Sequence, residues 1–420
     1  MPNLYHDTAE PAAAVPALEG GRQTDVLIVG AGFTGLSTAL SLAERGAGAV
    51  VLETHDPGWG ASGRNGGQVN AGLKADPDAV ERDFGADLGA RMSAFAGAAP
   101  AYVFDLIARL AIPCEARRNG TLRAAIRTRH VRKLEETANQ LARRGAAVEL
   151  FGRSESAAAT GNERYAAALF DRRGGDLNPL SFARGLARAA LRAGASIHGG
   201  SRVLSLSRSG DRWLARTARG TVTADQVVLA TNGYTDDLWP GLRRNVVPLF
   251  GAIVASEVLP EEIARQVMPA RPVLYESGAV TVYYRIDGAG RLLIGGRGPM
   301  SEISSVASAP HLPAYARELW PALRSVAWTH AWGGRLAMTA DRYPHIIEPA
   351  PGVIACLGYN GRGVALSTSM GGQIANRIMD RTAQFDMPIT SIKTIAFHRL
   401  WPLAVRAEIA RGRLCDMLGL

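Results

Sequence analysis

The feature that most constrains the fold is a glycine-rich turn, Gly30-Ala31-Gly32-Phe33-Thr34-Gly35, which lies between an apolar run and a helical pattern. The apolar run, residues 25–29, is typical of a strand buried on both faces of a parallel sheet. Residues 34–45 favour a helix, and a second strand at 49–52 ends at Glu53. Together these residues predict a βαβ unit that binds a dinucleotide.

The three glycines and the glutamate of this unit each have a physical role towards such a ligand. Gly30 permits a tight turn, Gly32 lets the backbone approach a pyrophosphate, and Gly35 lets the helix pack on the strand. The helix N-terminus faces the phosphates with free N–H groups and a partial positive charge. Glu53 is placed to accept hydrogen bonds from ribose hydroxyls. The motif by itself is compatible with either FAD or NAD.

Three further segments rich in glycine and amide side chains separate these two cofactors. Residues 60–68 (GASGRNGGQ) follow the second strand, and small residues there let an extended backbone pass a flat ring or a phosphate. The turns at 230–234 and 358–363 each follow a buried apolar strand, and the second of them opens a helix. A helix N-terminus at that place can stabilise negative charge on a flavin. The four turns together favour FAD.

Length and charge exclude several classes of protein. A chain of 420 residues is too long for one simple core and predicts two domains. The net charge is +9, yet the basic residues are scattered and not gathered into a stripe, so nucleic-acid binding is disfavoured. Solvated arginines are the preferred interpretation of this charge, and a funnel that steers anionic substrates is the alternative.

Cysteine and histidine usage predicts neither a metal site nor a redox dithiol. Cys114, Cys356 and Cys415 lie far apart, and the histidines lack the spacing of metal ligands. The odd number of cysteines favours a reducing compartment. Because no signal-peptide core and no run of about 18 apolar residues occur, we expect no integral membrane segment and a cytoplasmic location.

The remaining pattern predicts an α/β (α+β) fold, in which a discontinuous Rossmann-type FAD-binding domain is joined to a second, antiparallel-sheet substrate domain. Residues 1–23 are expected to form an irregular arm. We assign 24–76, 150–240 and 327–382 to the FAD-binding domain, 77–149 and 241–326 to the substrate domain, and 383–420 to a C-terminal tail or helix. Helices are expected at 77–112, 129–147, 180–193, 312–326 and 364–379. Further strands are expected at 121–126, 195–197, 203–207, 212–217, 227–230, 248–256, 280–286, 292–296 and 353–357.

The chain resembles the FAD-dependent amine and amino acid oxidoreductases of the D-amino acid oxidase superfamily, and within it the gamma-glutamylputrescine oxidases and related bacterial enzymes. The likeness spans roughly residues 20–402. The segments that carry it are, in order, DVLIVGAGFTGLSTAL, GWGASGRNGGQ, DLNPLSFARGLARAA, VVLATNGYT, YYRIDGAGRLLIGG, WGGRLAMTADRYP and GYNGRGVALS.

This resemblance, with the turns above, implies where FAD is held. Some relatives link the flavin covalently to Cys or His, but the loop at 60–68 contains neither, so we expect noncovalent FAD. Cys356 lies on an expected core strand and is interpreted as a buried small hydrophobe. The expected FAD contacts are Gly30, Gly32, Phe33, Thr34, Gly35, Glu53, Thr54, Ser62, Arg64, Asn65, Gly66, Gly67, Gln68, Val203, Ala230, Thr231, Gly233, Gly361, Arg362, Gly363 and Val364.

The resemblance also implies the chemistry, which is hydride removal from the carbon beside an amine to flavin N5. The imine product then hydrolyses, and O2 reoxidises the flavin with release of H2O2. Such chemistry needs a positioned C–H bond and a neutral amine more than a strong acid or base. The absence of a recognisable catalytic triad fits this requirement.

Candidate catalytic residues come from the expected second sheet. Strand alternation places Tyr283 and Arg285 on one face and Tyr284 on the other. For Tyr283, Arg285 and Trp332, the alternative to lining the substrate cavity is core packing or an ordinary surface ion pair. Arg335 follows Trp332-Gly333-Gly334 and could clamp a carboxylate with two hydrogen bonds, which would favour an amino or imino acid over a simple diamine.

Three other functions stay open. The first is a flavin dehydrogenase of the same fold that passes electrons to a quinone or carrier, and the second is a nicotinamide-only dehydrogenase. The third is a noncatalytic flavin-binding protein, against which the intact glycines of all four turns argue. The substrate candidates are gamma-glutamylated diamines, cyclic imino acids such as pipecolate or proline, N-methyl amino acids and D-amino acids.

Overall fold

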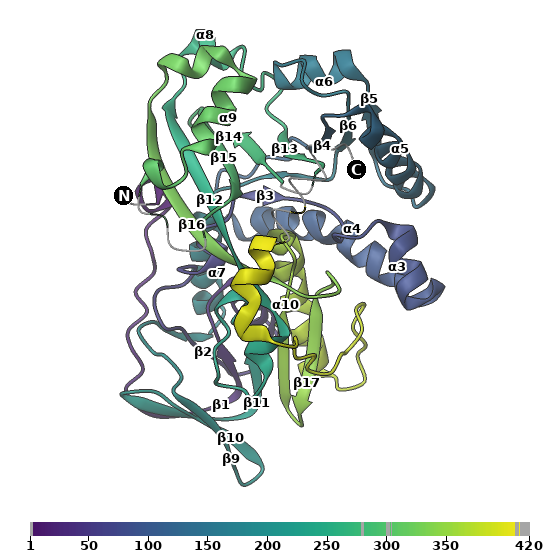
Figure 1. The fold of residues 1–420 in the computed structure, drawn as a ribbon. Helices are drawn as coiled ribbons and strands as arrows, with labels where there is room; N and C mark the ends of the chain where they lie inside the picture. Colours follow the sequence, from purple (N-terminus) through teal and green to yellow (C-terminus); the bar gives the residue numbers. More distant parts are fainter. Residues whose placement is uncertain (1–2, 279–280, 300–302, 304, 408–410, 412–420) are drawn as a thin grey trace.

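The computed structural model describes residues 3–278, 281–299, 303, 305–407 and 411 (Figure 1). Its described strands form two large sheets and one small pair, β3 (Gln68–Val69) with β7 (Gly175–Asp176). The first sheet lies in the lower half of the view in Figure 1 and the second in the upper half. The mixed α/β architecture with a second sheet confirms the predicted fold class.

The first sheet is built on the predicted βαβ unit. Its strand order is β17-β18-β11-β1-β2-β8, and all neighbours pair in parallel except β17, which is antiparallel to β18. Val26 and Ile28 face helices on one side, whereas Leu27 and Val29 face a second apolar cluster on the other, as expected for a strand buried on both faces. The bounds are β1 (Gly20–Val29), β2 (Ala49–Leu52), β8 (Ser196–His198), β9 (Ser205–Ser209), β10 (Arg212–Arg216), β11 (Gly220–Leu229), β17 (His345–Ala350) and β18 (Val353–Leu357).

The second sheet has the order β16-β12-β15-β14-β13-β4-β6-β5 and is antiparallel except where β13 meets β4. Its two faces alternate as predicted, because Tyr284 packs in one apolar cluster and Tyr283 against another. The bounds are β4 (Thr121–Ala125), β5 (Val148–Phe151), β6 (Ala167–Asp171), β12 (Val247–Val258), β13 (Val273–Glu276), β14 (Tyr283–Ile286), β15 (Arg291–Arg297) and β16 (Trp328–Met338).

Helices fill the space around and between the two sheets (Figure 1). The helix that follows the glycine-rich turn, α2, packs against α10 so closely that a Cβ at Gly371 would lie 2.6 Å from Cβ of Ser37. The bounds are α1 (Leu4–Thr8), α2 (Phe33–Ala43), α3 (Pro77–Phe84), α4 (Ala86–Leu110), α5 (Thr128–Arg143), α6 (Arg153–Thr160), α7 (Pro179–Arg192), α8 (Glu261–Ala264), α9 (His311–Leu319) and α10 (Gly363–Met379). Within the described part of the chain, no helix is both long and apolar enough to cross a bilayer.

Some segments join a different sheet from the one that the expected domain boundaries suggest. Strands β6 and β16 pair in the second sheet, although they lie within residues 150–240 and 327–382, which are expected in the FAD-binding domain. Conversely, Met92 and Val103 of α4 pack in the same core as Ile28 of β1, so residues 77–110 lie with the first sheet. The reason is nonlocal, because partner strands far apart in the chain decide which sheet a segment joins.

Several local expectations also need correction. The N-terminal arm is not irregular throughout, since Gly20–Thr24 extends β1 by pairing with β11, and α1 buries Leu4 and Tyr5. The expected helix at 312–326 ends at Leu319, where Pro321 opens a 3-10 turn. The expected strand at 203–207 begins at Ser205, and the strands β3, β5, β6, β7, β13, β16 and β17 were not expected. The strand expected at 280–286 begins at Tyr283, and Val280, like Cys415, lies outside the described residues.

Candidate active site

The glycine-rich turns predicted from the sequence meet at one edge of the first sheet. Gly30 has φ +105°, and a Cβ there would lie 3.0 Å from the carbonyl oxygen of Ala230, so the turn after β1 touches the turn after β11. Asn232 Oδ1 accepts a hydrogen bond from the backbone N–H of Gly358 (2.9 Å), which joins the turn after β18. Three turns from three parallel strands therefore converge, as the carboxyl ends of such strands do where nucleotides bind.

Close packing and two side chains fix the position of the start of α2. A Cβ at Gly35 would overlap the carbonyl oxygen of Gly30, so only glycine lets the helix sit this close to the strand. Glu53 Oε2 accepts from the backbone N–H of Ala31 (2.8 Å), and Ser62 Oγ accepts from that of Phe33 (3.0 Å). The two side chains thus hold this helix start and the second strand's end together beside the converging turns.

Amide side chains in the loop at 60–68 shape the loop itself. Asn65 Nδ2 donates to the carbonyl oxygens of Ala61 (3.0 Å) and Ser62 (2.9 Å), while its Oδ1 accepts from the N–H of Gly67 (2.8 Å). Gln68 Nε2 donates to the carbonyl of Leu274 on β13 (3.0 Å). Asn65 therefore acts as a positioning residue, and Gln68 ties the loop to the second sheet.

The remaining predicted contacts are divided between this edge and its flanks. Thr34 Oγ1 shares a hydrogen bond with Tyr359 Oη (2.7 Å), so α2 and the turn before α10 are linked. The N-terminus of α10 has no side-chain cap, which leaves its first N–H groups available to a ligand. Among the other predicted residues, Val203, Ala230 and Val364 are buried, whereas Thr54 is exposed. Gly233 packs on the carbonyl of Arg335, and the hydroxyls of Thr231 and Thr235 share a hydrogen bond.

These residues fit FAD as a noncovalent ligand. A Cβ at Gly30 or Gly35 would meet a backbone carbonyl oxygen, so only glycine permits this tight turn before α2, and the carboxylate of Glu53 stands at the end of β2. Cys356 is fully buried on β18, where burial raises the pKa of its thiol to about 12, and Tyr359 Oη donates to its sulfur (3.1 Å). A buried neutral thiol is a poor group for covalent flavin attachment.

A row of residues crosses the second sheet on the face that meets the loop at 60–68. The strand register aligns Trp332, Ile253, Gly295, Tyr283, Tyr275 and Arg123, and directly paired residues share a face. The ring of Tyr283 lies over Gly295 and against Gly66, where a Cβ would be 2.6 Å from the ring. Arg362, at the start of α10, donates to Tyr275 Oη (2.8 Å). The row therefore borders both the loop and the helix start expected to hold FAD.

Arg285 is neither a surface residue nor a free group in a cavity. Its guanidinium is 3% exposed, and it donates to Asp176 Oδ2 (2.9 Å), to the carbonyl of Gly66 (2.7 Å) and to Tyr5 Oη (3.3 Å). Asp176 is itself fully buried and also accepts from Arg117 Nε (3.0 Å). The chain's own groups thus engage Arg285, and its hydrogen bond to Gly66 holds the loop at 60–68.

Trp332 and Arg335 lie on different faces of β16. Trp332 is buried, its Nε1 donates to the carbonyl of Arg64 (3.1 Å), and its ring meets that of Tyr5 edge-on. Arg335 is exposed, and its guanidinium stands 5.4 Å from the ring centroids of both Tyr234 and Phe250. The structure therefore brings Tyr283 and Trp332 into one row and leaves Arg335 out of it.

Sequence reasoning missed several residues that shape this site. Asp176 and Tyr5 hold Arg285, and Arg123 ends the row beside Tyr275. The one available signal was the motif DLNP, in which an aspartate precedes a helix start without capping it, since Asn178 provides the cap. No local pattern indicates Tyr5 or Arg123, because Arg285, the partner of Tyr5, and Tyr275, the neighbour of Arg123 in the row, lie far away in the sequence.

A buried carboxylic acid lies on the opposite face of the second sheet. Glu276 is 5% exposed and accepts from Tyr315 Oη (2.6 Å) and Tyr165 Oη (2.8 Å). Burial raises the pKa of Glu276 to about 7, although the hydrogen bond from Tyr315 acts in the opposite direction. This acid therefore titrates near neutrality inside the protein.

Glu276→Gln is expected to make the protein more stable than the wild type at alkaline pH. Because folding raises this pKa, the carboxyl favours the folded state fully only below about pH 4.5, and the contribution is lost as pH rises through about 7. At pH 8.5 the variant should exceed the wild type by up to about 3 kcal/mol, and at pH 5.5 by much less. Urea unfolding at both pH values measures this, with the exposed Glu149→Gln as the control. Parallel stability curves for wild type and Glu276→Gln would contradict it.

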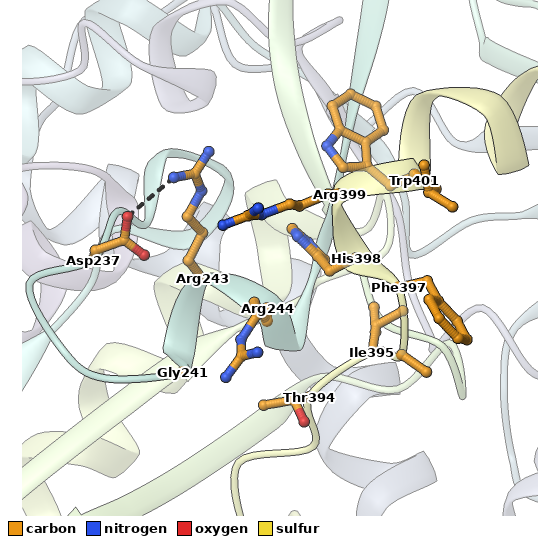
Figure 2. Close-up of a pocket in the computed structure, with 12 residues that line it drawn as sticks. Asp237, Gly241, Arg243, Arg244, Thr394, Ile395, Phe397, His398, Arg399 and Trp401 are labelled. Carbon is orange, nitrogen blue, oxygen red and sulfur yellow. Dashed lines mark hydrogen bonds and ion pairs between the residues drawn. The ribbon is translucent and has the colours of Figure 1, made fainter.

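A pocket of about 990 Å³ lies away from the residues described above, between the C-terminal segment and the turn at 237–244 (Figure 2). Arg243, Arg244, His398 and Arg399 line it, and Arg243 pairs with Asp237 (3.1 Å). None of its described lining residues belongs to the predicted cofactor or substrate sets. Among the described residues, no group of His, Cys, Asp and Glu is arranged to hold a metal ion.

Comparison with known proteins gives a family and a fold. The family model described as "DAO: FAD dependent oxidoreductase" matches residues 25–377. The chain is 31% identical to the probable oxidoreductase OrdL of Rhizobium meliloti (strain 1021), over 94% of this chain and 91% of that protein. It is 30% identical to the gamma-glutamylputrescine oxidoreductase of Escherichia coli (strain K12), over 91% and 90%.

Two solved structures share the fold. Glycine oxidase from Geobacillus kaustophilus superposes with a TM-score of 0.74 at 21% identity, over 89% of this chain and 99% of that one. L-proline dehydrogenase from P. horikoshii superposes with a TM-score of 0.70 at 17% identity, over 87% and 95%. At these identities the likeness concerns the fold alone.

Proposed function

The chain belongs to the DAO family of FAD-dependent oxidoreductases, and from this premise we propose that it oxidises a gamma-glutamylated diamine or a related amine at the carbon beside nitrogen. The predictions of an FAD cofactor, of an enzyme and of this family are confirmed. The finer assignment is supported by the relative from Escherichia coli, whose name states gamma-glutamylputrescine.

The observation that carries the proposal is the row from Trp332 to Arg123, which borders the loop at 60–68 and the start of α10. Bound FAD supplies a hydride acceptor at flavin N5. Gly30, Gly35 and Glu53 would hold its diphosphate and ribose, and the free N–H groups of α10 would face its ring. The row then provides the opposite wall, against which a substrate can be oriented.

The chain's side chains position and desolvate the amine. Tyr283 and Tyr275 offer flat apolar surface to the carbon chain, and burial raises the pKa of Tyr283 above its usual range, so its phenol keeps its proton. No described carboxylate is paired with either tyrosine, which suits a substrate that reacts as the neutral amine. In the proposed overall reaction, one amine, one O2 and one water give one aldehyde, one ammonia and one H2O2.

Oxygen uptake tests the proposed electron acceptor. With gamma-glutamylputrescine in air, we expect the enzyme to consume O2 and release H2O2 in equal amounts. A flavin that the amine reduces, but that O2 does not reoxidise while a quinone analogue does, would replace this proposal with the dehydrogenase alternative. Proline and D-alanine serve as comparison substrates in the same assay.

Arg335→Met is expected to change the KM for gamma-glutamylputrescine by no more than about twofold. The reason is that Arg335 stacks on Tyr234 and Phe250, on the face of β16 opposite Trp332. Steady-state kinetics measure the constant. A rise of about tenfold or more, the effect of losing a bidentate carboxylate contact, would restore Arg335 as a substrate ligand.

A further inference from the structure

A small cavity continues the row of the second sheet beyond Tyr275. It has a volume of about 70 Å³ and lies among β4, β6, α4, α5 and the loop before α3. Tyr275 and Arg362, which share a hydrogen bond, line it at the start of α10, and Arg123 and Arg173 also line it. We call it the arginine cavity. This volume exceeds that of two water molecules, so the cavity can hold one small polar group but not a cofactor.

The arginine cavity is polar and carries an excess of positive charge. Arg123 pairs with Asp76 (3.1 Å), and Arg173 pairs with Asp171 (2.7 Å), with all four side chains no more than 25% exposed. Each aspartate is therefore already neutralised by its own arginine, and Arg362 adds a further cation at the entrance. A negatively charged group is the ligand that this surplus favours.

Several hydrogen-bonding groups in the cavity still have capacity. Arg123 uses Nη1 and Nε on Asp76 and Ser277, and Arg173 uses Nε and Nη2 on Asp171. Arg123 Nη2 and Arg173 Nη1 make no hydrogen bond with a described residue. Ser93 Oγ, which is buried at the same cavity, likewise has no partner among the described residues. Unused donors around a small cavity are typical of a built polar subsite.

The spacing between strands gives the distance that a ligand would have to span from Tyr275 to the arginines. Tyr275 is the direct neighbour of Arg123 on β4, and Asp171 lies on the next strand, β6. Neighbouring strands are about 4.8 Å apart, so the two arginines lie about 5 to 10 Å sideways from Tyr275. A substrate whose carboxylate is attached to the oxidised carbon, such as glycine, is too short to span this separation.

We propose that the arginine cavity binds the carboxylate at the far end of an elongated amine substrate, with Arg123 and Arg173 as specificity-determining residues. The inference rests on the proposed function and adds the class of substrate, an amine joined through a flexible chain to a carboxylate. Gamma-glutamylputrescine has this form, with its amine at one end and the amino acid group of glutamate at the other.

Lys74 strengthens the positive field at the entrance. Its side chain is exposed, and no hydrogen bond or ion pair to a described residue engages it. Partial desolvation of its ammonium group, together with the charges of Arg362, Arg123 and Arg342, lowers the pKa of Lys74 below its usual value. A carboxylate arriving at this place would raise that pKa again, because an opposite charge favours the protonated amine.

Arg173→Met tests the proposal through the anaerobic reduction of the flavin. We expect the Kd of gamma-glutamylputrescine to rise at least tenfold, while the limiting rate of reduction changes little, because the contact is remote from the reacting carbon. The Kd of putrescine, which lacks the carboxylate, should stay unchanged. Arg172→Met is the matched control, since Arg172 pairs with Glu149 on the surface outside the cavity.

A second variant separates the cavity from the ion pair. Ser93→Leu fills the cavity from α4 and removes no charge, so it should raise the Kd of gamma-glutamylputrescine even if Arg173→Met folds poorly. An unchanged Kd in both variants, with the flavin still reduced, would overturn the inference and leave the proposed function intact. Wild-type flavin that neither amine reduces would refute the proposed function, and the inference with it.

Discussion

Gly35→Ala is expected to abolish FAD binding. A Cβ at this position would overlap the carbonyl oxygen of Gly30 and lie 3.2 Å from Cγ2 of Ile28. The carbonyl of Gly30 belongs to the backbone and cannot yield without moving α2 away from β1, and that movement withdraws the helix start from the phosphates. We expect a penalty above about 3 kcal/mol, which corresponds to a more than 100-fold weaker affinity for FAD. The flavin-to-protein absorbance ratio after desalting measures it.

Gly21→Ala is the matched control, because Gly21 lies on β1, the strand that precedes the turn, and its Cβ would meet only Thr221 Oγ1, at 3.7 Å. This variant should keep its flavin. Should Gly35→Ala prove insoluble, Gly32→Ala provides a milder form of the test, since its Cβ would lie 2.9 Å from the movable Oγ of Ser62. Retention of stoichiometric FAD by Gly35→Ala would show that this turn is not the phosphate site.

Arg285→Met is expected to lower the stability of the protein by about 3 to 5 kcal/mol, the usual cost of removing one partner from a buried ion pair. The substitution leaves Asp176 fully buried with Arg117 as its remaining cation, and it frees the carbonyl of Gly66 and the hydroxyl of Tyr5. Because Arg117 stays, the loss should fall near the lower end of that range. Urea unfolding of the FAD-saturated enzyme measures it.

Arg202→Met is the control for charge removal, since Arg202 and Asp236 form an exposed pair worth no more than about 1 kcal/mol. The competing interpretation makes Arg285 a substrate ligand. Unchanged stability together with a KM raised about tenfold or more would support that interpretation and contradict the structural role.

The FAD-binding edge was predictable from the sequence because its signals are local. The turn at Gly30, the helix after it and Glu53 lie within one short stretch, and each apolar strand is bounded by its own glycines. The face alternation of Tyr283 and Tyr284 was also predictable, since it follows from strand geometry alone. These expectations need no knowledge of which distant segments pair.

What failed depends on long-range pairing. Strand β16 was missed because Gly333 and Gly334 interrupt its pattern, and only its pairing with β12 establishes it as a strand. In this register Arg335 and Trp332 lie on opposite faces of the strand. Their separation of three residues would have predicted this if the segment had been assigned as a strand. The burial of Arg285 follows from Asp176 and Tyr5, which are 109 and 280 residues away.

The central claim is that this chain is an FAD-dependent oxidoreductase of an elongated amine, and anaerobic titration of the purified protein tests it most directly. The protein should carry the visible absorbance band of oxidised flavin. Gamma-glutamylputrescine should bleach that band at lower concentration than putrescine, proline, an N-methyl amino acid or a D-amino acid. Protein that takes up no flavin, or a flavin band that none of these amines bleaches, would contradict the account.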